Sequence, residues 1–262
     1  MAELVIGQRF NGPPGSANGG YAAGATAEAV RASTGWSEDV TVRLLRPPPL
    51  DEPLRLAPVE EAVEVRTGGA QDPTDSAARR AKTTQADLVA LARQESPPAW
   101  HPTEPVALER ARVVEGSYPG LLAHPFPTCF SCGPGRDPGD GLRIFPGRLQ
   151  AGLVASSWTP HASVAGDDGT VGLPVTWAAL DCVGGWSSDL EHRPLVLAEM
   201  CARVASPPQA GTAYVVVGTL LRSEGRKTWT ASAMFDGDRL VGQAEQLWLA
   251  VDWAVVQHLQ SS

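Results

Sequence analysis

The chain has 262 residues, of which 43% are hydrophobic and 19% charged, and its 21 Lys and Arg against 29 Asp and Glu give a net charge of −8 at pH 7. This composition is typical of a globular protein and argues against a disordered chain. Because no Lys- or Arg-rich run interrupts the acidic balance, we expect no nucleic-acid partner, although a local basic pocket for a phosphorylated ligand stays compatible with it.

No stretch reaches the roughly 18 uninterrupted apolar residues of a membrane span, and residues 1–14 lack the basic start and apolar run of a secretory signal. We therefore expect a cytoplasmic protein with no membrane partner. Its cysteines are then expected to stay reduced. They are Cys129, Cys132, Cys182 and Cys201.

The first half opens with one helix signal followed by strand signals. The alanine-rich run 22–32 predicts a helix, which Asn18 or Ser16 can cap. Val40–Leu45 alternates like a strand, and the three prolines that follow Arg46 end it. Further strands are predicted over 54–65, 77–85 and 88–94.

The second half repeats this order. Leu173–Cys182 predicts an apolar helix with Pro174 in its first turn, and Gly184-Gly185 is a natural end for it. Asp236-Gly237-Asp238 predicts a hairpin turn between the last two strands. The strands predicted in this half cover 142–145, 153–158, 196–205, 213–221, 227–235 and 240–250.

Matching features of the two halves are separated by a nearly constant interval. The separations are 154, 160 and 152 positions, measured from Gly20 to Pro174, from Pro47 to Pro207 and from Gln94 to Gln246. We expect a tandem repeat with an N-terminal unit at 1–98, a Pro/Gly-rich linker at 99–140 and a C-terminal unit at 141–262. A loose chance alignment within an ordinary α+β chain is the alternative.

Short motifs follow one another in a fixed order along most of the chain. They are Gly19–Ala23, Leu45–Pro47, Ser76–Arg80, Leu88–Gln94, Cys129–Gly133 with Gly141-Leu142, Trp177–Asp181, Ser206-Pro207 and Leu240–Gln246. In this order they resemble the hotdog-fold acyl-CoA thioesterase superfamily, and most closely its double-hotdog branch, the type II acyl-CoA thioesterases. The segment Cys129–Gly133 with Gly141-Leu142 resembles one found before the first strand of many single-hotdog thioesterases. The resemblance implies an α+β tandem double hotdog: two long helices, each wrapped by a curved antiparallel sheet, with active sites where the units meet.

The resemblance also implies site residues. The catalytic Asp of the second helix and the catalytic Gln of the last strand match Asp181 and Gln246. A Thr or Ser that the family places early in the strand after that helix falls near Leu197, which has no hydroxyl. Glu199, two residues on, is a candidate substitute. From the residues alone, Asp181 can instead bond a nearby turn and Gln246 can lie on a solvated strand face.

These residue types suit hydrolysis of an acyl-CoA or acyl-carrier thioester. A carboxylate on an apolar helix can act as a general base, and a glutamine amide can hold a water molecule. Backbone N–H groups of Gly19, Gly20 and Tyr21 at a helix start can bind the oxyanion. We expect Trp177 and Trp186 to line an apolar pocket formed by both halves. We expect a small thioester as the partner and no cofactor, since no phosphate-binding or dinucleotide-binding motif is present; a monomer and a homodimer both fit.

Two other functions stay open. A binding protein that has kept the pocket and lost the chemistry is favoured by Leu197. A hotdog hydratase or dehydratase would place a His five residues after the helix Asp, where this chain has Trp186. A serine hydrolase triad from Ser187, Ser188, Asp189 and His192 is not expected, because no G-x-S-x-G turn surrounds either serine.

Cys129 and Cys132 have the C-x-x-C spacing of metal ligands. A closed zinc site needs two more ligands, and the other candidates are single residues scattered along the chain. They are His124, His161, Cys182 and Cys201. We therefore expect no metal, and a turn that holds two thiols.

Overall fold

The structure is a computed structural model that describes residues 2–68 and 85–261. The motif Ser76–Arg80 lies outside the described residues, as does the strand predicted over 77–85, apart from Gln85, which begins a 3-10 turn. No helix in the described ranges is both long enough and apolar enough to span a membrane.

The two halves fold into the same series of elements: a strand, a long helix and four strands. The first series is β1 (Glu3–Val5), α1 (Gly19–Thr34), β2 (Val40–Leu44), β3 (Pro53–Val59), β4 (Ala62–Thr67) and β5 (Leu88–Gln94). The second is β7 (Leu153–Trp158), α3 (Leu173–Trp186), β8 (Leu195–Val204), β9 (Tyr214–Glu224), β10 (Lys227–Asp236) and β11 (Arg239–Ala250).

The remaining elements lie within, between and after the two series. They are α2 (Leu108–Glu115), β6 (Gly147–Gln150), α4 (Trp253–Ser261) and four 3-10 turns at Gln8–Phe10, Gln85–Asp87, Pro119–Leu121 and Ala162–Val164.

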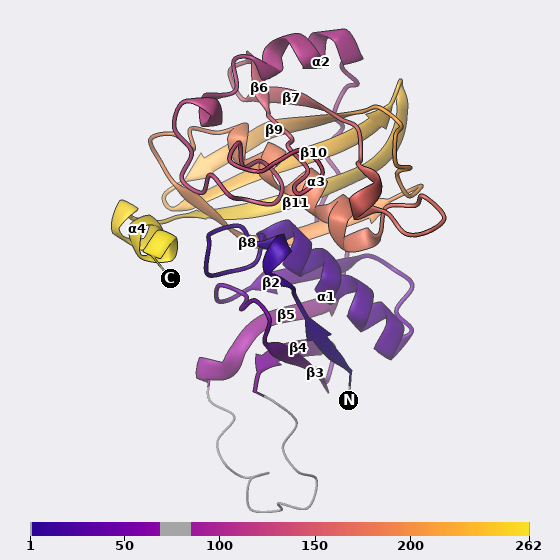
Figure 1. The fold of residues 1–262 in the computed structure, drawn as a ribbon. Coiled ribbons are helices and arrows are strands. Elements are labelled where there is room, and N and C mark those ends of the chain that lie inside the picture. Colours follow the sequence, from indigo (N-terminus) through magenta and orange to yellow (C-terminus); the bar gives the residue numbers. More distant parts are fainter. Residues whose placement is uncertain (1, 69–84, 262) are drawn as a thin grey trace, which may run out of the picture.

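The strands form one antiparallel sheet in the order β1-β3-β4-β5-β2-β8-β11-β10-β9-β7-β6. Outward from the β2–β8 pair, each side presents its strands in the same order: the strand after the helix, then the last, the next to last, the one before that, and the strand that precedes the helix. The halves are therefore related by an approximate twofold axis at this pair, and their sheets run together there, as Figure 1 shows. The predicted α+β tandem arrangement is confirmed.

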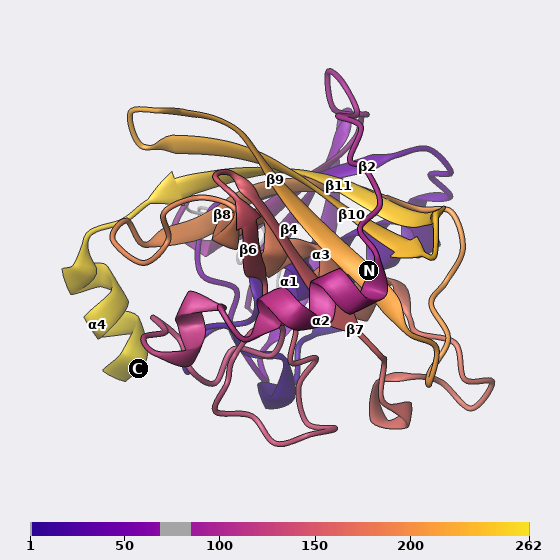
Figure 2. The same cartoon turned by 90° about the horizontal axis from the view of Figure 1, so that it is seen from above.

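The helices α1 and α3 lie side by side on one side of the long strands (Figures 1 and 2). Glycines make this close approach possible. A Cβ at Gly20 would lie 2.3 Å from Asp181 Cβ, and one at Gly24 would lie 2.8 Å from Trp177 Cβ. Real Cβ atoms do not come so close, so the α1–α3 contact requires glycine at both positions.

The start of α1 is capped as the sequence indicates. Asn18 Oδ1 accepts a hydrogen bond of 2.8 Å from the Tyr21 N–H, and the helix ends at Gly35, whose φ of 76° is left-handed. Strands 88–94 and 153–158 have their predicted bounds, and most other strands differ from prediction by one to three residues at an end.

Three predictions are wrong. The helix does not end at Gly184-Gly185 but continues to Trp186. At Gly184 the glycine admits the neighbouring sheet: an added Cβ would lie 2.7 Å from Gln246 Oε1. Residues 142–145 are not a strand, because Arg143 has a φ of 54° and the chain bonds back to the loop at 130–131. The single strand predicted over 54–65 is a hairpin, β3 and β4, that turns at Glu60, with a φ of 43°.

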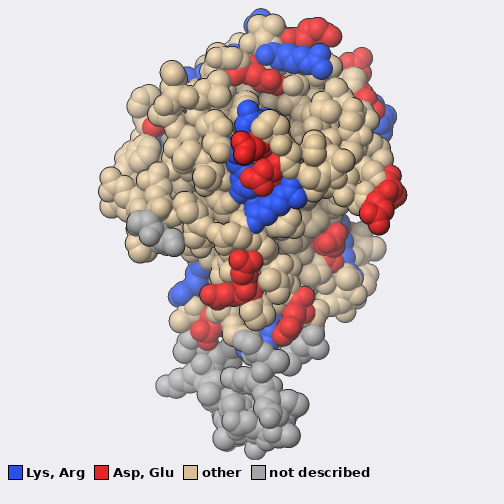
Figure 3. Space-filling model, viewed as in Figure 1, with Lys and Arg blue, Asp and Glu red and all other residues tan. Residues whose placement is uncertain are grey.

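Charges are spread thinly over the face in Figure 3, where Lys and Arg alternate with Asp and Glu among a larger uncharged area. No wide field of one sign covers this face. The view agrees with the absence of a basic run in the sequence.

Candidate functional site

A cavity of about 410 Å³ lies where the two halves meet. Its walls come from the segment before α1, the end of β2, the loop 124–132, α3, β8, the end of β11 and α4. Most of the lining is apolar, and the aromatic groups include Phe126, Trp186 and Trp248. A cavity lined by both halves is the pocket that the sequence predicts.

Asp181 is the carboxylate in the cavity wall. Its side chain is 2% exposed, and its Oδ2 accepts hydrogen bonds from the Gly20 N–H at 2.9 Å and from Asn18 Nδ2 at 3.0 Å. Its Oδ1 is buried and has no hydrogen-bond partner in the described part of the chain. Burial raises the pKa of Asp181 to about 7, against the lowering effect of these two donors. An acid of the second half is thus held by the helix start of the first.

The N–H groups of the Gly19–Tyr21 run have different partners. Those of Gly20 and Tyr21 bond to Asp181 and to the capping Asn18. The Gly19 N–H has no acceptor within the described ranges, and Gly19 lines the cavity. Leu197 lies against it, since a Cβ at Gly19 would be 2.8 Å from Leu197 Cβ. An apolar side chain therefore occupies the place where the resemblance calls for a hydroxyl.

Gln246 does not line this cavity. It is 3% exposed, and its Nε2 donates to the Leu180 carbonyl oxygen at 2.9 Å and to Ser232 Oγ at 2.8 Å. Its Oε1 accepts from Thr230 Oγ1 at 2.8 Å. The amide joins β10 and β11 to the backbone of α3, one residue before Asp181.

The other predicted residues lie in different places. Glu199 lies in a separate hollow of about 500 Å³, together with His101 and Glu245. Tyr21 stacks on Phe10 with ring centroids 3.8 Å apart. Trp177 is fully buried in the α1–α3 contact, and Trp186 lines the cavity. The structure thus places Asp181, Gly19 and Trp186 in the cavity lining, with Gly20 bonded to Asp181 but outside the lining. Tyr21 and Trp177 also lie outside it, and Gln246 and Glu199 line the separate hollow together.

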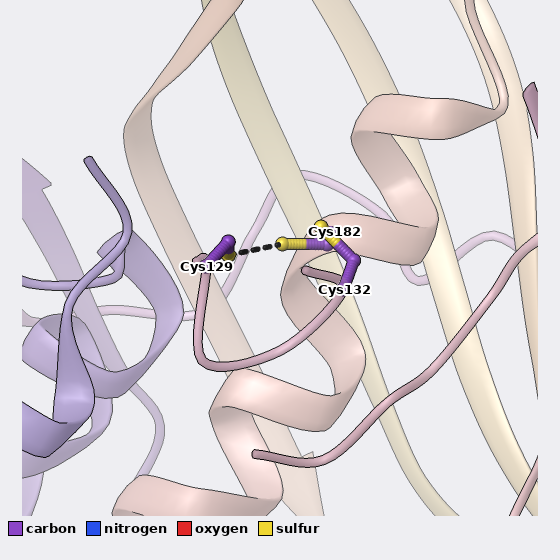
Figure 4. A group of neighbouring side chains, drawn as sticks. All are labelled: Cys129, Cys132 and Cys182. Carbon is purple, nitrogen blue, oxygen red and sulfur yellow. Dashed lines mark hydrogen bonds between the residues drawn. The ribbon is translucent and has the colours of Figure 1, made fainter. Parts of the chain in front are cut away.

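Three cysteines converge on the cavity wall beside Asp181 (Figure 4). Cys129 and Cys132 come from the loop that precedes β6, and Cys182 from α3. The three Sγ atoms lie within 4.8 Å of one another, and the Cys129–Cys182 sulfur distance is 3.8 Å. The spacing of Cys129 and Cys132 signals a pair, but no local pattern signals that Cys182, 50 residues on, joins it.

His124 lies next to this cluster. Its Nε2 is 3.2 Å from Cys132 Sγ, and its Nδ1 accepts a hydrogen bond of 2.9 Å from the Phe126 N–H. Burial lowers the pKa of His124 to about 4, so the ring is neutral at neutral pH. An accepting Nδ1 leaves the proton of the neutral ring on Nε2, which therefore donates to Cys132 Sγ.

Several solved structures superpose on this chain over 95% or more of its length. The tesB protein of Mycobacterium avium subspecies paratuberculosis superposes with a TM-score of 0.57 at 13% identity, over 96% of this chain and 94% of that one. A conserved protein of unknown function with a hotdog fold from Alicyclobacillus acidocaldarius gives a TM-score of 0.52 at 11% identity, over 95% and 92%. The chain has the hotdog fold.

A protein from Novosphingobium aromaticivorans, whose name assigns it provisionally to the thioesterases, superposes on this hotdog protein with a TM-score of 0.52 at 12% identity, over 95% of both chains. No family model matches the chain, and no curated protein matches it. The likeness is therefore one of fold.

The hotdog repeat is not symmetric at the site. At the offset of 154 positions, the equivalents of Gly20 and Asp181 are Pro174 and Ala27. Pro174 has no N–H to donate, and Ala27 has no carboxylate. Of the two equivalent positions where α1 and α3 meet, one therefore has a carboxylate and a backbone N–H that donates to it. The other has neither group.

Proposed function

We propose that this hotdog protein hydrolyses a small acyl thioester, such as an acyl-CoA or an acyl-carrier thioester, in the cavity between its halves. The observation that carries the proposal is Asp181: a carboxylate in the wall of a mostly apolar cavity, with one oxygen fixed by two donors and the other without a partner. An apolar cavity of this size holds an acyl chain by burial, which needs no directional contacts.

In the proposed step, Asp181 takes a proton from a water molecule as its oxygen adds to the thioester carbonyl carbon. The Gly19 N–H donates to the resulting oxyanion, as an N–H at a helix start is able to do. When the C–S bond breaks, the electron pair leaves with sulfur and the proton passes to the thiolate. The products are a carboxylic acid and a thiol.

Gln246 has a positioning role in this proposal. Its amide holds the Leu180 carbonyl oxygen and so fixes the turn of α3 that carries Asp181. Glu199 has no part in it, because it lies in the other hollow.

The test compares Asp181→Asn with wild type against acyl-CoA thioesters of increasing chain length, followed by loss of thioester absorbance. Asn can keep an oxygen facing the two donors, so the fold is expected to survive, while proton abstraction is lost. We expect kcat/KM to fall by about 10²–10⁴-fold, the contribution of a general base. Glu28→Gln, which neutralises an exposed carboxylate on α1, is the matched control and is expected to leave the rate unchanged.

A non-catalytic acyl-binding protein is the second candidate, and Leu197 packed on Gly19 favours it. In that case wild type and Asp181→Asn would hydrolyse all the thioesters equally slowly. Calorimetric titration with the same acyl-CoA series would still show binding by both proteins. This pair of results would overturn the hydrolase proposal.

A further inference from the structure

We propose that Cys129, Cys132 and Cys182 bind a zinc ion through their thiolates, at the wall of the cavity. This inference does not depend on the proposed function. Zinc in proteins prefers thiolate and imidazole ligands in a tetrahedron, with Zn–S distances of about 2.3 Å. Such a tetrahedron places two sulfurs about 3.8 Å apart. The Cys129–Cys182 distance is 3.8 Å, and all three sulfurs lie within 4.8 Å.

The backbone holds the two loop cysteines in a fixed turn. The Gly133 N–H donates to the Cys129 carbonyl oxygen at 2.9 Å, and the Cys129 N–H donates to the Phe126 carbonyl oxygen at 2.9 Å. A Cβ at Gly133 would lie 2.5 Å from Cys129 N and from Pro127 O, so only glycine can follow Cys132. Both thiols of the C-x-x-C pair are therefore directed by a rigid turn, and α3 supplies the third.

The groups around the sulfurs include hydrogen-bond donors and one acceptor, Asp181 Oδ2, which lies 3.9 Å from Cys182 Sγ. Asn18 Nδ2 lies 3.7 Å from Cys129 Sγ and 3.7 Å from Cys182 Sγ, and His124 Nε2 donates to Cys132 Sγ. Donors of this kind stabilise metal-bound thiolates from the surrounding shell of residues. One Nδ2 hydrogen of Asn18 bonds to Asp181 Oδ2, so Cys129 and Cys182 share the other, and His124 donates to Cys132. A zinc ion would offset the negative charge of the three thiolates.

His124 is assigned as a donor and not as a ligand. To bind zinc, Nε2 would have to offer its lone pair and Nδ1 would carry the proton, directed at the Phe126 N–H that now donates to it. The fourth position on zinc then falls to water or to a molecule from the cavity, which all three cysteines line. The same cavity gives the ion a path to the site.

The fourth cysteine of the chain provides a matched control. Cys201 lies on β8 in the second hollow, where its Sγ is 3.9 Å from the Glu95 carbonyl oxygen. It is as buried as Cys129 and Cys132 but is not part of the cluster. Cys201→Ser removes one buried thiol without removing a proposed ligand.

The experiment measures zinc by elemental mass spectrometry in the full-length protein, reduced, loaded with zinc and dialysed against a chelator of moderate affinity. We expect about one zinc per chain in wild type and Cys201→Ser, and its loss in Cys129→Ser, Cys132→Ser and Cys182→Ser. His124→Ala is expected to retain the ion with an affinity weaker by about 10–100-fold, as for other groups that orient ligands. Cobalt(II) titration of reduced wild type is expected to give sulfur-to-cobalt charge-transfer bands and the visible bands of a tetrahedral ion.

A second measurement keeps the test valid if a serine variant fails to fold. In folded wild type, zinc is expected to protect three thiols per chain from a thiol reagent at one equivalent of metal. Wild type without bound zinc and without cobalt charge-transfer bands would overturn the proposal. So would equal metal content in the cluster variants and Cys201→Ser, or a Cys129–Cys182 disulfide that forms in place of metal binding. Loss of zinc in His124→Ala as complete as in the cysteine variants would overturn its assignment as a donor.

Discussion

Gly20→Ala tests the contact between α1 and α3 on which the site depends. The new Cβ would lie 2.3 Å from Asp181 Cβ and 2.8 Å from the Trp177 carbonyl oxygen. Neither atom belongs to the flexible end of a long side chain, so the two helices must move apart. Separation also lengthens the 2.9 Å hydrogen bond from the Gly20 N–H to Asp181 Oδ2.

Three effects set the size of the change in stability. Alanine favours a helix over glycine by about 1 kcal/mol, overpacking a core costs about 1–3 kcal/mol, and a lost hydrogen bond to a charged group costs about 1.5–3 kcal/mol. We therefore expect the free energy of unfolding to fall by about 2–4 kcal/mol. A loss of this size is large against the usual total stability of a domain.

The assay is equilibrium unfolding in urea, followed by tryptophan fluorescence, with Gly116→Ala as the control. Gly116 ends α2 with a φ of −63°, and a Cβ there would meet only Val113 O at 3.7 Å. Alanine at such a position is expected to be neutral or to stabilise by about 0.4–1 kcal/mol. If Gly20→Ala were as stable as Gly116→Ala, the inference that glycine sets the α1–α3 distance would be refuted.

Two further predictions concern polar contacts outside the cavity lining. Burial by itself raises the pKa of Asp39. The hydrogen bonds that Arg203 and Ser96 donate to its carboxylate have the larger combined effect, so the pKa lies below its ordinary value. Because the folded pKa is the lower one, this pair stabilises the fold above the unfolded pKa of about 3.9 and the effect is lost as pH falls through the folded pKa. Asp39→Asn is expected to lower the free energy of unfolding by about 1 kcal/mol at neutral pH. Urea unfolding at successive pH values should also show a smaller loss of stability toward acid pH in the variant than in wild type. An unchanged dependence on pH would contradict this. Gln246→Met leaves buried polar partners unpaired and is expected to lower the free energy of unfolding by about 2–4 kcal/mol. The control is Gln243→Met, at a half-buried position of β11, which is expected to change this free energy little. Equal losses in the two variants would contradict the role given to Gln246.

The repeat and the order of the elements could be predicted because both are local patterns. The alternation of Val40–Leu45 predicts β2, the strand signals at 88–94 and 153–158 match the bounds of β5 and β7, and the alanine-rich run lies within α1. The errors arose where tertiary contacts decide. Gly184-Gly185 reads as a helix end, but here the glycines lie where β10 and β11 press on α3. Residues 142–145 have strand composition, but the left-handed Arg143 turns the chain toward the cysteine loop.

The site was predictable only in part for a similar reason. Asp181 is an unusual carboxylate in an apolar helix, so the sequence indicates it directly. The sequence around Gln246 gives the same pattern whether its side chain faces a pocket or a buried backbone carbonyl, because either would lie on the inner side of the strand. Only the structure shows that it donates to the Leu180 carbonyl oxygen. The approach of Cys182 to the C-x-x-C pair depends on how the loop before β6 crosses α3, and no spacing encodes it.

The asymmetry of the repeat has a physical consequence for the cavity. Asn18 occupies the cap of α1 and uses both ends of its amide: Oδ1 accepts from Tyr21, and Nδ2 donates to Asp181 with two cysteine sulfurs nearby. At the equivalent place in the second half, Gly172 caps α3 and has no side chain to do this. One capping residue therefore ties the start of α1 to the acid and to the thiols. The repeat equivalents of Gly20 and Asp181 are Pro174 and Ala27, which offer a polar ligand neither an N–H donor nor a carboxylate. A chain with two fused units can therefore keep one polar site in the α1–α3 pair, while the equivalent position serves only to pack the helices.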